Sequence, residues 1–439
     1  MHSKIYDNSV NYTATVVEIK QLFPIEKSDN ILRAVINHCD TVVSKDTGIG
    51  EWGLFFPPET QLSDTFLKNN NLYRDSTLNV DITQKGYFET NGRIRCQVFR
   101  GVKSEGFYIP IKSLDFLGID LTDISAGYEF NEIEGIEICK KYIPKNSRIQ
   151  GTGNKTQAKR KQIDLICEGQ WHFHYDTLKL VSQLHEFKPE DVIVITRKKH
   201  GSSHISSNLL VKKELRWFEK VLNYLGVNIK TEEYQNVYSS RKVIKAVGET
   251  NLANEGFYDE DIWKAANNIM KPLLINGQTI YCELYGYQPN SSKFIQSGYD
   301  YGNSVGSMNL DVYRITTTSP EGIVHEWDWE SVKQWCNKYD VNHVEEMYYG
   351  TAQLFTPLNP GETNEQWQEQ FLEDIKTEFL EKDAWDCKNN VPDEGVCIMN
   401  LSNRVWRKCK SWKFLHHESL ELDKGNEIDL ESQESQTEE

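Results

Sequence analysis

Four consecutive apolar residues, Val192 to Ile195, are followed after one residue by the polar sequence R-K-K-H-G-S-S-H at positions 197–204. All four are β-branched, and such a run is typical of a strand buried in a hydrophobic core. We therefore expect the strand to leave the core at adjacent cations, an imidazole, a glycine and two hydroxyls. Taken alone, this change of character indicates a solvated turn, and other parts of the chain must decide whether the turn carries chemistry.

Lys198 has a distinctive position in this stretch. Because the side chains of a strand alternate between two faces, Lys198 shares a face with Thr196, whereas Arg197 and Lys199 point to the other face. Cations on both sides favour the neutral amine of Lys198 by like-charge repulsion. Gly201 lets a phosphate approach the backbone closely. These are the requirements of a lysine nucleophile that attacks phosphorus.

The composition is that of a globular protein of two or three domains. The chain has 439 residues, of which 38% are hydrophobic and 26% charged. No apolar run approaches the roughly 20 residues that a membrane-spanning helix needs, and the opening M-H-S-K-I-Y-D lacks the apolar core of a secretory signal. The nine cysteines include no C-x-x-C pair, which favours neither a zinc ribbon nor a disulfide framework. We expect a cytoplasmic protein that has no membrane association.

The net charge of −16 is distributed unevenly. Residues 418–439 contain nine acidic residues and one lysine, a charge of −8, and no aromatic residue, which predicts a disordered acidic tail. Residues 139–162, in contrast, contain eight lysines and arginines and no acidic residue. The stretch 141–162 fits a solvated linker or, more specifically, a segment that follows a nucleic-acid backbone. The overall acidity therefore does not exclude a nucleic-acid partner.

The first 140 residues are expected to form a β-rich domain. Its strand-like runs are Thr13–Ile19, Ile31–Ile36, Arg93–Phe99 and Gly106–Ile111. A small OB-like barrel and a generic β-sandwich fit this pattern equally well. The other expected segments are the basic linker at 141–162, an α/β domain at 163–417 and the acidic tail at 418–439. The predicted fold class is α+β.

Residues 163–417 alternate between helical and strand patterns. Helices are expected at Thr177–Phe187, Lys212–Leu225, Trp329–Lys338 and Glu365–Glu381. Strands are expected at Val192–Ile195, Thr279–Leu284, Met308–Thr316 and Gly395–Met399. Gly226 is expected to cap the second of these helices.

Six short sequences follow one another through this region. They are K-K-H-G at 198–201, V-Y-S-S-R at 237–241, Y-C-E-L-Y-G at 281–286, L-D-V-Y-R-I at 310–315, D-E-G-V-C-I at 393–398 and K-C-K-S-W-K-F at 408–414. In this order they resemble motifs I, Ia, III, IIIa, IV and V of the covalent nucleotidyltransferases, the superfamily of ATP-dependent ligases and capping enzymes. The histidine form of motif I is typical of one group of RNA ligases. Each match alone is weak, whereas six in the correct order favour catalysis.

The resemblance implies a reaction centre built on Lys198. This lysine would attack the α-phosphate of ATP, and Glu283 and Glu394 would bind Mg²⁺ or Mn²⁺, which prefer oxygen ligands. Lys408 and Lys410, at alternate positions of one strand, would face the negative charge that develops on the phosphate.

The resemblance also assigns residues to the nucleotide. Arg241 would steady the nucleotide or the product phosphate through its planar guanidinium group. Tyr313 would lie against the adenine ring, and Gly201 would contribute to the nucleotide-binding turn. His200 has two possible roles, one near the phosphate and one in ordering the turn.

A sequence near the N-terminus narrows the resemblance. G-R-I-R-C-Q-V-F-R-G-V-K-S-E-G at 92–106 is similar to the R-I-R…R-G-x-x-S-x-G element of Deinococcus-type RNA ligases. Those enzymes carry an N-terminal OB domain, and the resemblance covers about residues 10–415. It implies an OB-like barrel followed by an ATP-grasp-like ligase domain of antiparallel sheets and helices. We expect no C-terminal OB domain after the motif V match.

The predicted function is ATP-dependent sealing of RNA that has 5′-phosphate and 3′-hydroxyl ends, most naturally in a nicked or broken duplex. A non-catalytic RNA-binding protein and a GTP-using capping-type transferase are the alternatives. W-H-F-H at 171–174 offers two histidines to a metal, but without a third ligand at a suitable spacing a half-exposed strand is the simpler interpretation. The sequence leaves the oligomeric state open.

Overall fold

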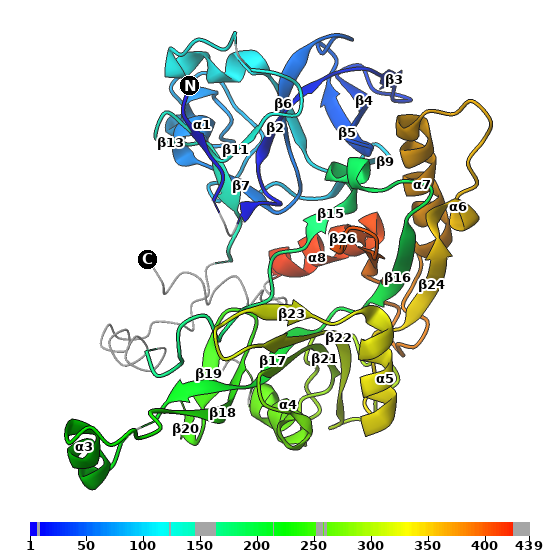
Figure 1. Cartoon of the computed structure of the whole chain (residues 1–439). Coiled ribbons are helices and arrows are strands. Elements are labelled where there is room, and N and C mark those ends of the chain that lie inside the picture. The colour runs from blue at the N-terminus through cyan, green and yellow to red at the C-terminus, as the bar shows by residue number, and fades with distance from the viewer. Residues whose placement is uncertain are drawn as a thin grey trace.

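The computed structural model describes residues 1–6, 9–122, 124–144, 164–213, 215–251, 258 and 261–424. The fold is α+β and its sheets are mainly antiparallel. Figure 1 shows an N-terminal module (residues 1–144, blue to cyan), and a C-terminal module (residues 164–424) that carries two larger sheets. Most of the predicted basic linker lies outside the described residues.

The strands of the N-terminal module form several small sheets. A four-stranded sheet has the order β10-β6-β2-β11, and a three-stranded sheet has the order β3-β4-β5. Their strands are β2 (Ala14–Glu18), β3 (Leu22–Pro24), β4 (Ile31–Ile36), β5 (Cys39–Ser44), β6 (Trp52–Phe56), β10 (Phe107–Pro110) and β11 (Glu129–Phe130). The expected strands at 13–19, 31–36 and 106–111 correspond to β2, β4 and β10. Only the end of the run at 93–99 is extended.

Smaller elements complete this module. Short ladders join β1 (Ser3–Lys4) with β12 (Glu132–Ile133) and β13 (Ile136–Glu137), β7 (Thr60–Leu62) with β14 (Cys139–Lys141), and β8 (Gln97–Phe99) with β9 (Val102–Ser104). Helix α1 (Asp64–Asn69) begins at Ser63, whose hydroxyl accepts a hydrogen bond from the backbone N–H of Phe66. The described strands thus form separate sheets and not one closed barrel.

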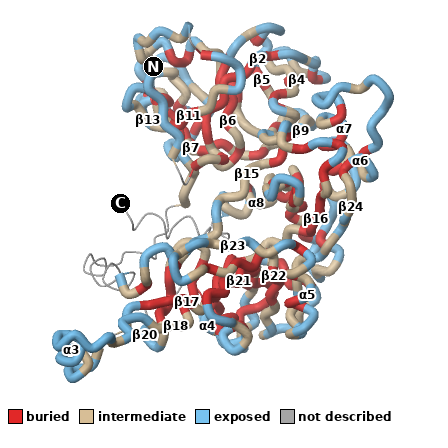
Figure 2. Tube along the Cα trace, in the orientation of Figure 1, coloured by how far each residue is buried: buried red, intermediate tan, exposed pale blue. Residues whose placement is uncertain are grey.

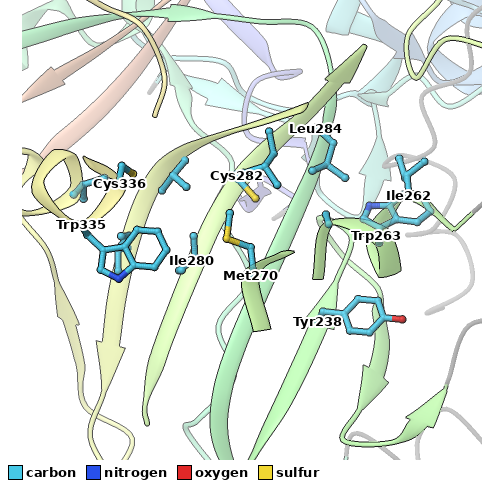
Figure 3. Packing of buried hydrophobic residues seen from close by; sticks show 14 of the residues in the cluster. Tyr238, Ile262, Trp263, Met270, Ile280, Cys282, Leu284, Trp335 and Cys336 are labelled. Atoms are coloured by element: carbon cyan, nitrogen blue, oxygen red, sulfur yellow. The ribbon is translucent and has the colours of Figure 1, made fainter. Parts of the chain in front are cut away.

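The first large sheet of the C-terminal module has seven strands. Their order is β20 (Thr250–Asn251), β19 (Ile244–Val247), β18 (Glu232–Ser239), β17 (Ser202–Lys212), β21 (Gln278–Gly286), β22 (Met308–Thr318) and β23 (Val324–Glu326). Helices α4 (Ile262–Met270) and α5 (Trp329–Tyr339) cover one face. Figure 3 shows the resulting core, in which Ile280, Cys282 and Leu284 of β21 lie near Met270 and Trp335. Since side chains alternate, Tyr281 and Glu283 face the other side of the sheet.

The second large sheet has five strands. Their order is β15 (Leu178–Lys179), β26 (Val405–Lys410), β25 (Gly395–Asn400), β16 (Val192–Lys198) and β24 (Glu346–Thr351). On one face, Ile193 and Ile195 pack with Trp367 and Phe371 of α7 (Asn364–Phe379). The opposite face presents Thr196 and the lysines at the strand ends to the centre of the molecule. Short helix α6 (Ala352–Phe355) follows β24.

Two expected helices differ from the structure. The segment Thr177–Phe187 is not an α-helix: it contains β15 and two 3-10 turns, η4 (Leu180–Ser182) and η5 (Leu184–Glu186). Its apolar side chains are buried as a helical pattern requires, but pairing of β15 with β26 holds its beginning extended. A helix does form within 212–225 as α3 (Trp217–Tyr224), capped by Gly226, although β17 includes Lys212.

Helix α3 projects from the body of the molecule, and its expected apolar face is not buried (Figures 1 and 2). Phe218, Leu222 and Leu225 are 41%, 38% and 69% exposed. Helix α8 (Trp412–Lys424) extends past Glu418, so the first residues of the expected tail are helical, whereas 425–439 lie outside the described residues. No described helix is both long and apolar enough to cross a membrane.

Candidate functional site

A cavity of about 670 Å³ lies where the two large sheets and the N-terminal module meet. All nine residues that the sequence analysis selects border this cavity: Lys198, His200, Gly201, Arg241, Glu283, Tyr313, Glu394, Lys408 and Lys410. Tyr12 and Glu105 of the N-terminal module line it as well. The motif matches, which are spread over more than two hundred residues, therefore converge on one place.

Lys198 is the last residue of β16 and lies opposite Gly395 of β25. Its Nζ donates a hydrogen bond to Oε2 of Glu394 at 2.8 Å. Burial lowers the pKa of Lys198, but Glu394 and Glu283 raise it more, and the net shift is upward. The expectation that adjacent cations favour the neutral amine is wrong, because two carboxylates dominate its surroundings.

The two neighbours of Lys198 each pair with carboxylates of their own. The side chain of Arg197 is 1% exposed and is held by both carboxylate oxygens of Asp386 at 2.8 Å. Nζ of Lys199 donates a hydrogen bond to Oδ2 of Asp311 at 2.8 Å. Since each cation has its own carboxylate, neither governs the charge of Lys198.

Glu394 bridges two of the candidate lysines. Its Oε2 accepts from Lys198, and its Oε1 lies 2.9 Å from Nζ of Lys410. Burial raises the pKa of Glu394, but Lys198, Lys410 and His200 lower it more, to about 2. This carboxylate is therefore ionised at neutral pH although it is only 2% exposed.

Lys408 and Lys410 lie two residues apart on β26, and both reach the cavity. Their pKa values shift in opposite directions. Burial and then the nearby Arg241 lower the pKa of Lys408 well below its usual value. For Lys410, burial has the same effect, but Glu394 and Glu418 outweigh it and raise the pKa. Carboxylates of the protein thus balance the positive charge of Lys410, whereas the amine of Lys408 gains more from an added anion.

Glu283 and Glu394 are suitable carboxylates for a divalent cation. Both border the cavity, and both act electrostatically on Lys198. Mg²⁺ keeps several waters and needs only one or two carboxylates together with substrate phosphates, so the residues present fit such an ion. The described residues contain no group of three or more His, Cys, Asp or Glu side chains that could hold a metal, and His172 and His174 form no such site.

The turn between β16 and β17 packs tightly against β21. A Cβ on Gly201 would lie 2.2 Å from the carbonyl oxygen of Leu284 and 2.9 Å from Cγ of Glu283. Glycine is therefore required here because two protein segments, this turn and β21, approach each other closely. The ring of His200 makes edge contacts with Tyr299 and Phe414 at centroid distances of 5.0 Å.

A β-bulge sets the position of Tyr313. On β21, Tyr281 pairs with Arg314 but the next residue, Cys282, pairs with Val312, so Tyr313 is the extra residue of β22. Because a bulge breaks strict alternation, Tyr313 and Arg314 both lie on the side of Tyr281, with Arg314 4.5 Å from the Tyr281 ring centroid. The bulge thereby adds an aromatic side chain to the cavity wall.

Arg241 lies in the turn after β18 and forms an ion pair with Asp176. Burial raises the pKa of Asp176, but Arg241 and then Lys242 lower it more, so the carboxylate is ionised. This pairing holds the guanidinium group at the cavity wall.

Three residues of one segment border the cavity although sequence reasoning did not select them: His174, Asp176 and Lys179. Lys179 lies opposite Lys408 in the parallel ladder of β15 and β26, which places both lysines on one sheet face. The histidine pair at 172 and 174 is the available sequence signal, but its spacing suggests a metal site and not a place beside Tyr313. Nothing in the sequence indicated the register of β15.

The R-I-R sequence joins the two modules. Arg93 is held by both carboxylate oxygens of Glu59 at 2.8 Å, and its Nη1 donates to Oδ1 of Asp423 on α8 at 3.0 Å. Arg95 donates to the other oxygen of Asp423 at 2.8 Å. These arginines thus fix α8, which continues from the strand of Lys408 and Lys410, onto the N-terminal module.

No protein-family model and no curated protein matches this sequence. Among solved structures, a Naegleria gruberi RNA ligase mutant with AMP and Mn has a TM-score of 0.55 and 15% identity, over 92% of this chain and 98% of that chain. A mutant of this ligase with ATP and Mn has a TM-score of 0.55 and 14% identity, with the same coverage of both chains. The ligase with pyrophosphate has a TM-score of 0.56 and 14% identity, over 94% of this chain and 99% of that chain. The chain has the RNA ligase fold. At this identity the likeness concerns the fold, and it extends over nearly the whole of both chains.

Proposed function

We propose that this protein is an ATP-dependent RNA ligase that joins 5′-phosphate and 3′-hydroxyl ends. The observation that carries the proposal is the amine of Lys198, which borders a large cavity between two carboxylates and the lysines of β26. The Naegleria ligase, whose structures contain ATP, AMP and pyrophosphate, supports ATP as the nucleotide.

In the first step, the neutral amine of Lys198 attacks the α-phosphorus of ATP. A nitrogen–phosphorus bond forms, the bond from that phosphorus to the bridging oxygen breaks, and pyrophosphate leaves. The amine loses a proton to solvent, since Glu394, with a pKa of about 2, is a weak base. Lys408 and Lys410 stabilise the negative charge that develops on the phosphate oxygens.

Glu283 and Glu394 would hold a Mg²⁺ or Mn²⁺ ion, which would supply Lewis-acid stabilisation of the phosphate charge. Cation binding at Glu394 would compete with Lys198 and Lys410 for the carboxylate oxygens. Arg241 would contact the nucleotide phosphate or ribose once the anion competes with Asp176. Tyr313 would supply the ring on which the adenine stacks.

In the later steps, an oxygen of the RNA 5′-phosphate attacks the phosphorus bound to Lys198, which leaves as an amine and regains a proton. The 3′-hydroxyl of the adjoining strand then attacks the activated 5′-phosphorus, AMP leaves, and the hydroxyl proton is lost. The net result is one phosphodiester bond per ATP.

The N-terminal module is proposed to act as an OB-like RNA-binding domain of the Deinococcus type, with the basic segment at 141–162 beside it. Support comes from the way the module closes one side of the cavity: the Nζ atoms of Lys141 and Lys179 lie 5.7 and 5.8 Å from the ring centroid of Tyr12. Cations around an aromatic ring suit a nucleic-acid strand. A nicked or broken duplex RNA in the cytoplasm is the proposed substrate.

The test is transfer of label from α-labelled ATP to the purified protein in the presence of Mg²⁺. Lys198→Ala should abolish the transfer. Lys199→Ala is the matched control, because its amine pairs with Asp311 and not with Glu394, and it should leave the transfer measurable. Label that persists in Lys198→Ala would refute the assignment of the nucleophile.

Two further measurements separate the alternatives. Transfer from GTP in preference to ATP would indicate a capping-type enzyme, and no transfer from either would indicate a non-catalytic RNA-binding protein. Nicked duplexes with ribose or deoxyribose on the 3′-hydroxyl side would then define the substrate, and we expect sealing to require ribose there.

A further inference from the structure

The structure assigns a base-recognition role to His174, a residue outside all six motif matches. We infer that its imidazole accepts a hydrogen bond from the exocyclic amine of adenine and so contributes to the choice of ATP. This inference rests on the proposed function, since it concerns the nucleotide that modifies Lys198.

The first observation is the place of His174 among aromatic rings on the cavity wall. Its ring centroid lies 5.1 Å from that of Tyr313, 5.8 Å from that of Tyr281 and 4.7 Å from that of Tyr175. The planes of His174 and Tyr313 are inclined by 68°. A polar ring therefore stands beside the tyrosine that the bulge in β22 directs into the cavity.

The second observation is that hydrogen bonds do not fix this imidazole. Its Nδ1 is buried and has no hydrogen-bond partner among the described residues. A ligand at this wall of the cavity therefore meets an imidazole whose tautomer no hydrogen bond to the described residues fixes.

The third observation is the charge of the ring. Burial, followed by the nearby cations Arg314, Arg241 and Lys408, lowers the pKa of His174 well below its usual value. The imidazole is therefore neutral at pH 7 and offers a lone pair as an acceptor, which an imidazolium ion cannot do. Adenine presents an amino group at the position where guanine presents a carbonyl oxygen, and an acceptor at this place favours adenine.

The test compares ATP with purine riboside triphosphate, which lacks only the exocyclic amine. Formation of the Lys198 adduct is followed by intact-protein mass spectrometry over a range of nucleotide concentrations with Mg²⁺. For the native protein, we expect the KM for ATP to be about tenfold lower than for the analogue, as one hydrogen bond provides. In His174→Ala the ratio should fall to about one, because only the KM for ATP rises.

His172→Ala is the matched control. His172 lies two residues away and is exposed, and its Nε2 is 2.7 Å from the carbonyl oxygen of Gly169, outside the cavity lining. In His172→Ala, the ratio of the KM for the analogue to the KM for ATP should equal that of the native protein. His174→Phe keeps an aromatic ring without the nitrogens and should behave like His174→Ala, whereas His174→Asn keeps an acceptor and should restore part of the ratio.

The outcomes separate the two proposals. If neither nucleotide modifies Lys198 of the native protein, the proposed function fails. If both nucleotides modify it and the ratio is the same in the native protein, His174→Ala and His174→Phe, the function stands and the role of His174 is refuted. His174→Phe decides the question if the alanine variant does not fold.

Discussion

Lys198 must lose a proton before its amine can attack phosphorus, and Glu394 opposes this loss because its carboxylate stabilises the ammonium form. In Glu394→Gln, burial and the remaining cation Lys410 should lower the pKa of Lys198. An amine-reactive acylating reagent consumes only the neutral amine, so the midpoint of its pH profile at Lys198 should move to lower pH. Mass spectrometry of the modified peptide gives this profile.

Glu345→Gln is the control for that measurement. Glu345 lies 3.6 Å from Arg197 and does not enter the electrostatic surroundings of Lys198. Its profile should coincide with that of the native protein. An unchanged midpoint in Glu394→Gln would contradict the conclusion that carboxylates set the charge of the nucleophile.

Gly201 is a second residue with a sharp expectation. A methyl group there would clash with the carbonyl oxygen of Leu284, which belongs to a strand and cannot move freely. Gly201→Ala should lower the free energy of unfolding by about 1–3 kcal/mol, as overpacking does. Urea unfolding measures this loss, and Gly48→Ala, where a Cβ meets nothing within 4 Å, should change stability far less.

The sequence could predict the residues whose chemical type and local spacing carry information. Lys198, Glu394 and Lys408 were found in this way, and all of them border the cavity. It could not predict Lys179, because its place depends on pairing of a two-residue strand with a strand more than two hundred residues later. Nor could it predict the pKa of Lys198, because the carboxylates that set it are distant in sequence.

At the scale of elements, α8 connects the strand of the candidate lysines to the N-terminal module. Arg93, whose side chain is 2% exposed, lies between Glu59 and Asp423 of this helix. Arg93→Ala should lower the free energy of unfolding by about 1–3 kcal/mol, since it removes a buried guanidinium and leaves Glu59 with the hydroxyl of Ser419 and Asp423 with Arg95. Denaturant unfolding provides the value, and hydrogen exchange should show faster opening of α8.

Arg95→Ala tests whether that effect depends on burial. Arg95 contacts the same aspartate, but its side chain is 27% exposed, so its ion pair should contribute no more than about 1 kcal/mol. Equal losses in the two variants would contradict the view that Arg93 anchors the helix by a buried network.

Element patterns were predictable where one face of a strand or helix meets a core. The patterns at Trp329–Lys338 and Gly395–Met399 predicted α5 and β25 to within one residue, whereas the apolar run Val192–Ile195 predicted only the first four residues of β16. The bulge at Tyr313 was not predictable, because it depends on the register between β21 and β22. The exposure of α3 was not predictable either, because periodicity gives an apolar face without saying whether anything covers it.

At the scale of the whole molecule, the cavity exists only because two modules and two sheets meet around it. A ligand that binds there stabilises the assembled state and not the unfolded chain, so its binding free energy adds to that of folding. For a nucleotide at a hundred times its Kd, this addition is about 2.7 kcal/mol. ATP with Mg²⁺ should therefore raise the Tm of the protein.

Lys198→Ala makes this prediction independent of covalent chemistry, because it removes the nucleophile and keeps Lys408, Arg241 and the two carboxylates. We expect its Tm to rise with ATP and Mg²⁺ and the rise to shrink when EDTA removes the metal. Lys408→Ala in the same background should reduce the shift further, since burial and nearby cations lower the pKa of Lys408 and an added anion would favour its charged form more than that of Lys410. A Tm that ATP leaves unchanged in both the native protein and Lys198→Ala would mean that the convergence of the modules does not create a nucleotide site.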